Sequence, residues 1–213
     1  MMKNKVVYIT GPDGIGKTTY LKSIEDKLIA GEKSTRHIWI RSPKIISKPL
    51  MAYCRFIGLT KYKKIDGITY GAHLFYKSKI VSFIFPILQL IDFKIKWFLA
   101  KWSIKPDDVV LFDRFSLDTL ADLMVDTRKY QMHKNWVGRA FLKMLPENVD
   151  IIILHVNEEV IRSRKLDTLH DDHLALKIKV YQILSKDLNL KVIDNNRPIE
   201  VVKPELLNYF LHE

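Results

Sequence analysis

The chain of 213 residues contains a single cysteine, Cys54, and this scarcity excludes several classes of protein. One thiol cannot build a disulfide framework, nor can it supply the ligand cluster of a cysteine-rich zinc site. Both absences fit a reducing compartment, so we expect a cytoplasmic protein. The histidines, including His73, His155 and His170, are scattered without metal-ligand spacing, and we interpret them as structural or surface residues.

The chain also lacks an uninterrupted apolar segment long enough to span a membrane. Its most apolar stretch, residues 80–102, is interrupted by Pro86, is charge-free only as far as Asp92, and then contains Lys94 and Lys96. A spanning helix needs about 20 consecutive apolar residues. We therefore expect a buried helix or one face of a dimer interface, with superficial membrane contact as an alternative. No secretory signal is visible before the first apolar run.

Internal repeats and low-complexity linkers are absent as well, so we expect one α/β domain over residues 1–213. A hydrophobic content of 47% is enough for one substantial core. Lys and Arg number 35 against 24 Asp and Glu, which gives a formal charge of +11. The basic residues occur along the whole chain without a dense basic tail. This pattern favours small anionic substrates and makes nucleic acid the less favoured partner.

Five short apolar runs, separated by helical segments, predict five strands. They are Lys5–Ile9, His37–Arg41, Val109–Asp113, Asp150–Val156 and Lys191–Ile193. Helices between strands are typical of βα crossovers, and they predict a mostly parallel sheet with helices on both faces. In such sheets ligands bind at the carboxyl ends of the strands, so the residues that end each run are the candidate site residues.

The first run leads directly into "GPDGIGKTT", Gly11–Thr19, which is typical of a phosphate-binding loop. Its glycines allow the backbone N–H groups to wrap the phosphates of a nucleotide, and the following helix adds its positive N-terminal end. Lys17 would reach the β- and γ-phosphates, and the Thr18 hydroxyl would bind Mg²⁺. The predicted nucleotide-binding residues are Gly11, Asp13, Gly14, Ile15, Gly16, Lys17, Thr18 and Thr19. The loop predicts ATP and Mg²⁺ as ligands.

Charged residues at two other predicted strand ends complete the site. Asp113 ends the third run, where its carboxylate could hold Mg²⁺, and Arg114 follows with a guanidinium that could clamp a phosphate. Arg41 and Lys44 lie at the end of the second run. Cations at both places suit an acceptor that is already phosphorylated, although Asp113 could also serve a hydroxyl acceptor as a general base.

A basic cluster after the fourth run is interpreted as a small lid over residues 157–172. Arg162, Arg164 and Lys165 could swing over the transferring phosphoryl group and offset its charge. A solvated helix face is the alternative. The phosphate-binding loop has Ile15 rather than an arginine, which makes an external cation the more favoured source of positive charge.

The order of these motifs resembles the thymidylate kinase family of P-loop nucleoside monophosphate kinases over nearly the whole chain. The resemblance rests on "GPDGIGKTT", "IRSP", "HLFYKSK", "DRFSLDTLAD", "VNEEVIRSRK" and "VIDNNRPIEVV". It implies a five-stranded parallel sheet in the order 2-3-1-4-5, a homodimer, and the transfer of a phosphoryl group from ATP to dTMP with Mg²⁺. The basic lid would be the one found in bacterial members.

The resemblance also implies roles for five residues of the acceptor site. Asp13 would face the sugar of the acceptor, and Phe75 would stack on its base. Lys79 lies where the family has an arginine that hydrogen-bonds the base. Arg41 and Arg114 would hold the acceptor phosphate.

Departures from the family pattern concentrate around the base. Ser42 replaces a glutamate, Thr10 replaces an acid, and Lys79 has no planar fork for bidentate contacts. Where the family has a Tyr-Gln pair after the third strand, this chain has Asp122 and Leu123. The acceptor could therefore be a nucleoside or another small metabolite instead of dTMP. A third hypothesis is a non-metabolic ATP-binding protein that associates with nucleic acid.

Overall fold

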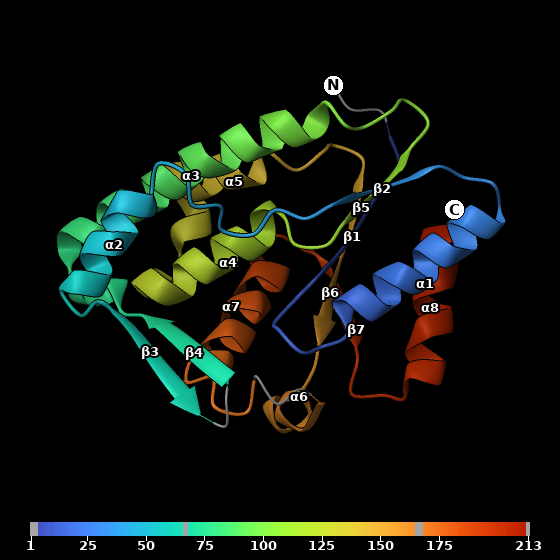
Figure 1. Ribbon diagram of the computed structural model, residues 1–213. Coiled ribbons are helices and arrows are strands. Elements are labelled where there is room, and N and C mark those ends of the chain that lie inside the picture. Colours follow the sequence, from blue (N-terminus) through green and yellow to red (C-terminus); the bar gives the residue numbers. More distant parts are fainter. Residues whose placement is uncertain (1–3, 66–67, 165–167, 212–213) are drawn as a thin grey trace.

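Five parallel strands form the central sheet in the computed structural model, which describes residues 4–65, 68–164 and 168–211 (Figure 1). The strands are β1 (Val6–Thr10), β2 (Thr35–Ile38), β5 (Val109–Phe112), β6 (Val149–His155) and β7 (Lys191–Asp194). They lie in the order β2-β5-β1-β6-β7, and every pairing is parallel. The predicted sheet and its order 2-3-1-4-5 are confirmed.

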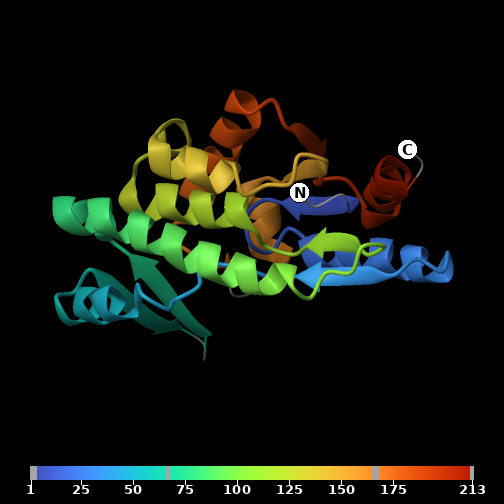
Figure 2. The ribbon, with the colours of Figure 1, turned by 90° about the horizontal axis from the view of Figure 1, so that it is seen from above.

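Helices cover both faces of this sheet, as the two views show (Figures 1 and 2). The helices on one face are α1 (Lys17–Ala30) and α8 (Ile199–Leu211), and those on the other are α3 (Lys79–Lys101), α4 (Ser116–Thr127), α5 (Trp136–Leu142) and α7 (Leu174–Asp187). Side chains of β1 alternate between the two layers. Val7 and Ile9 join the core beneath α1 and α8, whereas Val6 and Tyr8 join the opposite core. The fold is therefore a three-layer α/β sandwich.

The boundary of the second strand differs from the prediction. It ends at Ile38 rather than Arg41, because pairing with β5 stops where β5 itself ends at Phe112. Arg41 consequently lies in a loop beyond the strand, where its side chain can turn over the edge of the sheet.

An antiparallel hairpin lies outside the main sheet and was not predicted. It consists of β3 (Thr60–Ile65) and β4 (Ile68–His73), and it follows the short helix α2 (Lys48–Phe56). The Asp66-Gly67 pair between two β-prone runs is the sequence signal that identifies such a hairpin. A further short helix, α6 (Glu158–Arg164), follows β6.

Helix α3 continues through Pro86, so the proline interrupts the apolar stretch in sequence but does not end the helix. Proline has no N–H to donate to the carbonyl four residues earlier, which belongs to Ser82. The Lys129 ammonium donates to that carbonyl oxygen instead, at 2.9 Å. The orphaned acceptor is thus satisfied and the helix stays continuous. Among the described residues, no helix has the length and apolar character needed to cross a membrane.

Candidate active site

The loop between β1 and α1 adopts a conformation that requires glycine. Gly11, Gly14 and Gly16 have φ angles of 140°, 82° and 88°, where side chains are strained. A Cβ atom on Gly11 would also lie 2.9 Å from the carbonyl oxygen of Leu154. Loop and helix N-terminus together form the backbone arrangement that binds phosphates.

Lys17 begins α1 and is almost fully buried under this loop. Its ammonium donates hydrogen bonds to the carbonyl oxygens of Gly11, at 2.7 Å, and Pro12. Burial, and then the nearby positive charge of Arg114, lower the pKa of Lys17 to about 7. An anion bound in the loop would raise the pKa of Lys17 again, because it favours the charged ammonium.

We therefore expect ATP binding to be coupled to proton uptake. Above about pH 7 the free protein holds Lys17 increasingly neutral, whereas the phosphates favour the charged ammonium. Uptake should approach one proton per ATP at about pH 8, and affinity should fall as the pH rises further. Calorimetric titrations in buffers of different ionisation enthalpy measure this uptake. Equal heats in all buffers would contradict the expectation, and Lys17→Met should abolish the buffer dependence.

A cavity of about 540 Å³ lies over the loop and has the place expected for the nucleotide. Its lining residues are Gly14, Ile15, Gly16, Lys17, Thr18, Thr19, Tyr20, Arg114, Arg164, Asn195 and Ile199. Asn195 follows β7, accepts a hydrogen bond from the Tyr20 hydroxyl at 2.5 Å and donates to the carbonyl oxygen of Ile15 at 2.7 Å. Asn195 and Ile199 belong to the quoted "VIDNNRPIEVV" segment, but sequence reasoning assigned them no role.

Two hard oxygen ligands lie together at the edge of this cavity. The Thr18 hydroxyl donates to the carboxylate of Asp113 at 3.0 Å. A hydroxyl and a carboxylate beside a phosphate-binding loop fit the preference of Mg²⁺ for oxygen. The predicted pair is thus brought together, and it could hold the ion between itself and the phosphates.

Asp13 is the centre of a cluster of cations. Arg41 donates to both of its carboxylate oxygens, at 3.0 and 2.9 Å, and Arg114 donates to one of them. The Lys177 ammonium lies 3.8 Å away. Burial by itself would raise the pKa of Asp13, but the surrounding cations, Arg41 foremost, hold it far below its usual range. Asp13 is therefore ionised and a poor general base at neutral pH.

The conformation of Arg114 is strained. Its φ angle of 75° lies in the left-handed region, which costs a non-glycine residue about 1 kcal/mol or more. The side chain is held between Asp13 and Asp118, and its carbonyl oxygen accepts from the amide of Ile40 at 3.0 Å. Such strain persists only where the surroundings fix the residue, so the guanidinium is positioned before any ligand arrives.

Asp118 is a buried carboxylate that sequence reasoning did not single out. It accepts from the hydroxyls of Tyr8 (2.5 Å), Thr10 (2.9 Å) and Tyr181 (2.9 Å), and from the amide of Phe115 (3.0 Å). Burial alone would raise its pKa, but the charge of Arg114 and these hydrogen bonds lower it below the usual value. Its place three residues after "DRF" in "DRFSLD" was the available signal.

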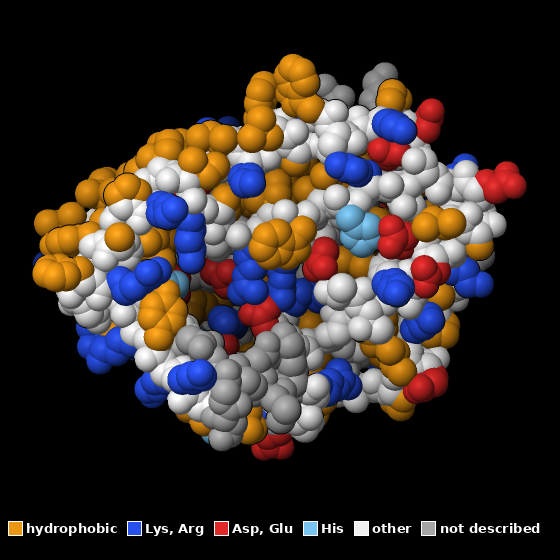
Figure 3. All heavy atoms as spheres, viewed as in Figure 1, with side chains coloured by type: hydrophobic (Ala, Val, Ile, Leu, Met, Phe, Trp, Pro, Cys, Tyr) orange, Lys and Arg blue, Asp and Glu red, His pale blue; other side chains and the backbone are white. Residues whose placement is uncertain are grey.

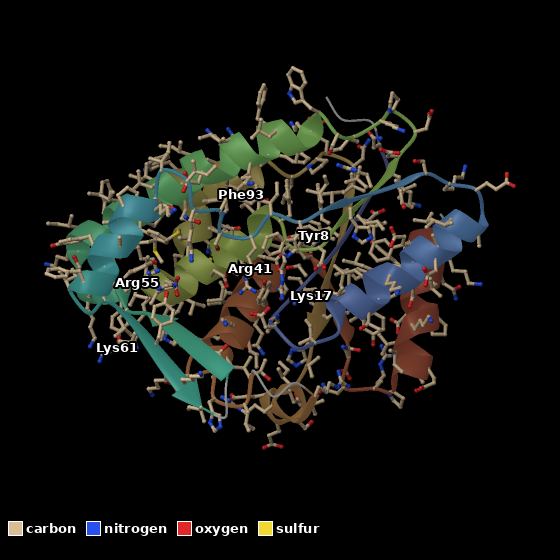
Figure 4. The ribbon with its side chains drawn as sticks, in the orientation of Figure 1. Tyr8, Lys17, Arg41, Arg55, Lys61 and Phe93 are labelled. Carbon is tan, nitrogen blue, oxygen red and sulfur yellow. The ribbon has the colours of Figure 1, made fainter. Side chains whose placement is uncertain are left out.

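A second cavity, of about 570 Å³, adjoins the cation cluster and is the candidate acceptor site. Its lining residues are Asp13, Arg41, Lys61, Lys63, Gly71, Ala72, Leu74, Tyr76, Arg128, Thr168, His170, Asp171, Asp172, His173, Leu176 and Lys177. Figure 3 shows acidic and basic side chains gathered in the hollow on this face. Lys17 and Arg41 both come from the carboxyl edge of the sheet (Figure 4).

An aromatic–cation pair lines this cavity and was also not predicted. The guanidinium carbon of Arg128 lies 3.7 Å from the centre of the Tyr76 ring. A flat ring beside a cation is suited to contact a planar, anionic ligand. His170, interpreted from the sequence as structural or surface, lines the same cavity. The described residues contain no cluster of His, Cys, Asp and Glu fit for a metal ion.

The two residues implied to read the base lie elsewhere. Phe75 is fully buried, stacks on His73 with ring centres 5.0 Å apart, and packs against Phe85. It begins a short 3₁₀ helix, Phe75–Lys77, and its ring is covered by the core. Lys79 is exposed at the start of α3 and lines neither cavity. The neighbouring Tyr76 occupies the cavity instead.

The predicted lid cations also separate. Arg162 pairs with Glu158 at 2.7 Å and donates to the carbonyl oxygens of Thr168, Leu169 and Asp171. Arg162 therefore binds the backbone of residues 168–171, and its guanidinium is engaged there instead of being available to clamp a phosphate. Arg164 lines the cavity over the phosphate-binding loop. Lys165 lies outside the described residues.

Comparisons with known proteins give one structural likeness. A gluconokinase structure from Sinorhizobium meliloti 1021 is similar over 99% of this chain and 93% of its own, with 14% identity and a TM-score of 0.48. Neither protein-family models nor curated proteins give a match. The two cavities are therefore the basis for assigning an activity.

Proposed function

We propose that this protein is an ATP-dependent kinase that phosphorylates a nucleoside monophosphate, with dTMP as the first acceptor to test. One observation carries the proposal. Arg114 lines the nucleotide cavity and pairs with Asp13, which lines the second cavity together with Arg41 and Lys177. The two cavities thus meet at a cluster of cations, where a phosphoryl group could pass between them.

The charge around Asp13 favours a phosphate as the receiving group. Asp13 would be a poor base for a hydroxyl acceptor, because its pKa is held far below its usual range. A phosphate acceptor carries its own nucleophilic oxygen, and its second pKa is about 6. It needs cations to position it and to offset repulsion from ATP. Arg41, Arg114 and Lys177 are placed to do this.

The transfer itself would depend on position and electrostatics. An oxygen of the acceptor phosphate would attack the γ-phosphorus, the bond to the β–γ bridging oxygen would break, and ADP would leave with that electron pair. Lys17 would hold the β- and γ-phosphates, and Arg114 and Arg164 would contact the transferring group from outside the loop. Mg²⁺, held by Thr18 and Asp113, would offset charge on the phosphates.

A hydroxyl acceptor is the second candidate, because carboxylates line a smaller cavity beside the acceptor site. Asp122, Asp126 and Asp171 face this cavity of about 310 Å³. Burial and the neighbouring Asp122 raise the pKa of Asp126 well above its usual value. Carboxyl groups of this kind can bind the hydroxyls of a nucleoside or another small metabolite, with Asp113 as the base.

An acceptor panel tests the proposal. The protein is incubated with Mg-ATP and, in turn, nucleoside monophosphates, nucleosides and small polyhydroxylated metabolites, and ADP formation is followed by chromatography. We expect turnover with at least one nucleoside monophosphate and none with Lys17→Ala. If no member of the panel is phosphorylated by the intact protein, the proposal fails. Turnover of hydroxyl acceptors alone would favour the second candidate.

Arg41 should affect the acceptor much more than ATP. Its guanidinium faces the acceptor cavity, so Arg41→Ala is expected to raise the acceptor KM by about 10- to 100-fold, the usual worth of a charged hydrogen bond. The KM for ATP should change little. Arg36→Ala is the matched control, because Arg36 is exposed on β2 and bonds only Ser103 among the contacts described. Equal effects of the two variants, or a larger effect on ATP, would contradict this role.

A further inference from the structure

Helix α3 is apolar on its outer face as well as on the face that packs against the core. Phe85, Phe93 and Trp97 point inward and are buried. The exposed apolar residues on the opposite side form the α3 outer face, which comprises Ile80, Phe83, Ile84, Ile91, Phe98, Leu99 and Trp102. A helix that is apolar all round normally has a partner on each side. The outer face therefore indicates a contact beyond this chain.

The residues of the α3 outer face recur at helical spacing over the whole length of the helix. Ile80, Ile84, Ile91, Phe98 and Trp102 follow one another at intervals of four, seven, seven and four residues, which keeps them on one stripe. The 23-residue helix makes this stripe about 34 Å long. Trp102 is 80% exposed at one end. Figure 3 shows hydrophobic side chains along the corresponding edge of the molecule.

Helix α2 also exposes apolar side chains. Tyr53 and Phe56 are 54% and 90% exposed, and Ile57 just beyond the helix is also exposed. Exposed aromatic rings beside aliphatic side chains are typical of helices that lie in a membrane interface. Soluble monomers rarely expose so large an apolar area without a function.

The positive charge of the chain is concentrated in the same segment, although basic residues occur throughout. Residues 41–105 contain 13 of the 35 Lys and Arg but only two of the 24 Asp and Glu. The remaining 22 basic and 22 acidic residues cancel, so this segment accounts for the whole formal charge of +11. Some of its cations line the acceptor cavity, whereas Lys94, Lys96 and Lys101 lie on α3 itself. Of its two acids, Asp92 is buried and accepts hydrogen bonds from the amides of Ile45, Ile46 and Ser47. Its charge is thus directed inward.

A groove between α3 and the segment after α5 combines both properties. It has a volume of about 380 Å³ and is lined by Lys94, Trp97, Phe98, Lys101, Lys143, Met144, Leu145, Pro146 and Glu147. The Lys101 ammonium lies 4.9 Å from the centre of the Trp97 ring. Apolar walls with three ammonium groups fit an amphiphile whose head is anionic.

We propose that the α3 outer face docks this protein on the surface of an anionic phospholipid membrane. The apolar stripe would enter the interface between headgroups and acyl chains, and the flanking lysines would contact anionic headgroups. Because no described helix can cross a membrane, the contact is peripheral. The proposal does not depend on which acceptor the protein phosphorylates.

Two other partners could cover the α3 outer face, a second copy of the chain or a nucleic acid, and both fit it less well than a membrane. A second copy of the chain in a two-fold dimer would place the same basic segment against itself, and the like charges would oppose the contact. Nucleic acid would match the charge, and Phe83, Phe98 and Trp102 could stack on bases. The aliphatic side chains between them, Ile80, Ile84, Ile91 and Leu99, offer neither stacking nor hydrogen bonds, so an apolar phase suits the whole stripe better. An anionic bilayer satisfies both the apolar stripe and the basic flanks.

Vesicle flotation with the full chain tests the proposal. We expect the protein to float with vesicles of phosphatidylcholine and phosphatidylglycerol, to float weakly with phosphatidylcholine alone, and to be released by high salt. The triple variant Phe83→Glu, Phe98→Glu, Trp102→Glu should lose at least about tenfold in vesicle affinity. Thermal unfolding verifies that it is folded.

A charge variant keeps the test valid if the apolar variant does not fold. Lys48→Glu, Lys94→Glu and Lys96→Glu together should also weaken vesicle binding about tenfold. Lys22→Glu, Lys33→Glu and Lys203→Glu make the same charge change at exposed positions outside the segment and should leave binding unchanged. The proposal is overturned if the intact protein does not float or if both charge variants lose binding equally. It is also overturned if light scattering shows that the protein is a dimer and that the apolar variant is a monomer, because a second copy would then occupy this face.

Discussion

Replacing Lys17 with methionine is expected to lower kcat for phosphoryl transfer about a thousandfold or more. Methionine keeps the length of the side chain but removes the ammonium that would offset charge on the β- and γ-phosphates. Steady-state kinetics with saturating Mg-ATP and the acceptor found in the panel measures the effect. Lys22→Met, at an exposed position of the same helix, should keep wild-type activity. A Lys17→Met protein with more than about a tenth of wild-type kcat would contradict this role.

The same substitution should leave Tm unchanged or raise it. The pKa of Lys17 is lowered to about 7 in the folded protein, whereas an unfolded lysine titrates near 10.4. Between these values the unfolded chain binds more protons, so the ionisation of Lys17 opposes folding, and its contribution to stability rises as the pH increases through this window. Methionine removes that opposition. Loss of activity with retained Tm would identify Lys17 as a residue kept for function.

Replacing Asp118 with alanine is expected to lower the free energy of unfolding by about 3 to 5 kcal/mol, the usual cost of removing one member of a buried charge pair. The change would leave the hydroxyls of Tyr8 and Tyr181 and the guanidinium of Arg114 without their common acceptor. Urea denaturation measures the loss. Asp118→Asn should cost less, because the amide oxygen still accepts, and exposed Asp107→Ala should cost little. A loss within about 1 kcal/mol for Asp118→Ala would contradict this account.

Asp118 should also make stability depend on pH in the acid range. Its folded pKa is lowered, so its contribution is fully present above the unfolded value of about 3.9 and is lost as the pH falls through the folded pKa. The wild-type protein should therefore lose more stability on acidification than Asp118→Asn does. Tm measured from neutral to acid pH provides the comparison.

The five strands and their parallel direction could be predicted because local signals were strong, whereas the order 2-3-1-4-5 came from the resemblance to the thymidylate kinase family. Each strand is a short β-branched run, and helical segments between the runs leave little choice but parallel crossovers. The phosphate-binding loop was equally clear, since glycines at left-handed positions and Lys17 are fixed by the chemistry of phosphates. Thr18 and Asp113 also met as predicted, because neighbouring strands end at one edge.

The acceptor cavity was predicted less well because its residues come from distant segments. Phe75 and Tyr76 are adjacent aromatic residues in the sequence, yet the first is buried in the core and the second lines the cavity. Asp122, seen in the sequence as a departure from the family, pairs with Arg41 at 3.0 Å across 81 residues. Arg162 resembled a lid cation, but nearby carbonyl groups bind it. No local sequence pattern predicts these contacts.

The nature of the bond formed is the most direct test of the central claim that cations around Asp13 receive a phosphate. ³¹P NMR of the phosphorylated acceptor, separated from ATP and ADP by chromatography, distinguishes a new phosphoanhydride, whose two phosphorus nuclei couple, from a phosphate monoester, whose phosphorus does not couple to another. The account predicts a coupled pair on a nucleoside diphosphate, absent with Lys17→Ala and reduced with Arg41→Ala. A monoester on a hydroxyl acceptor as the sole product, or no product at all, would contradict it.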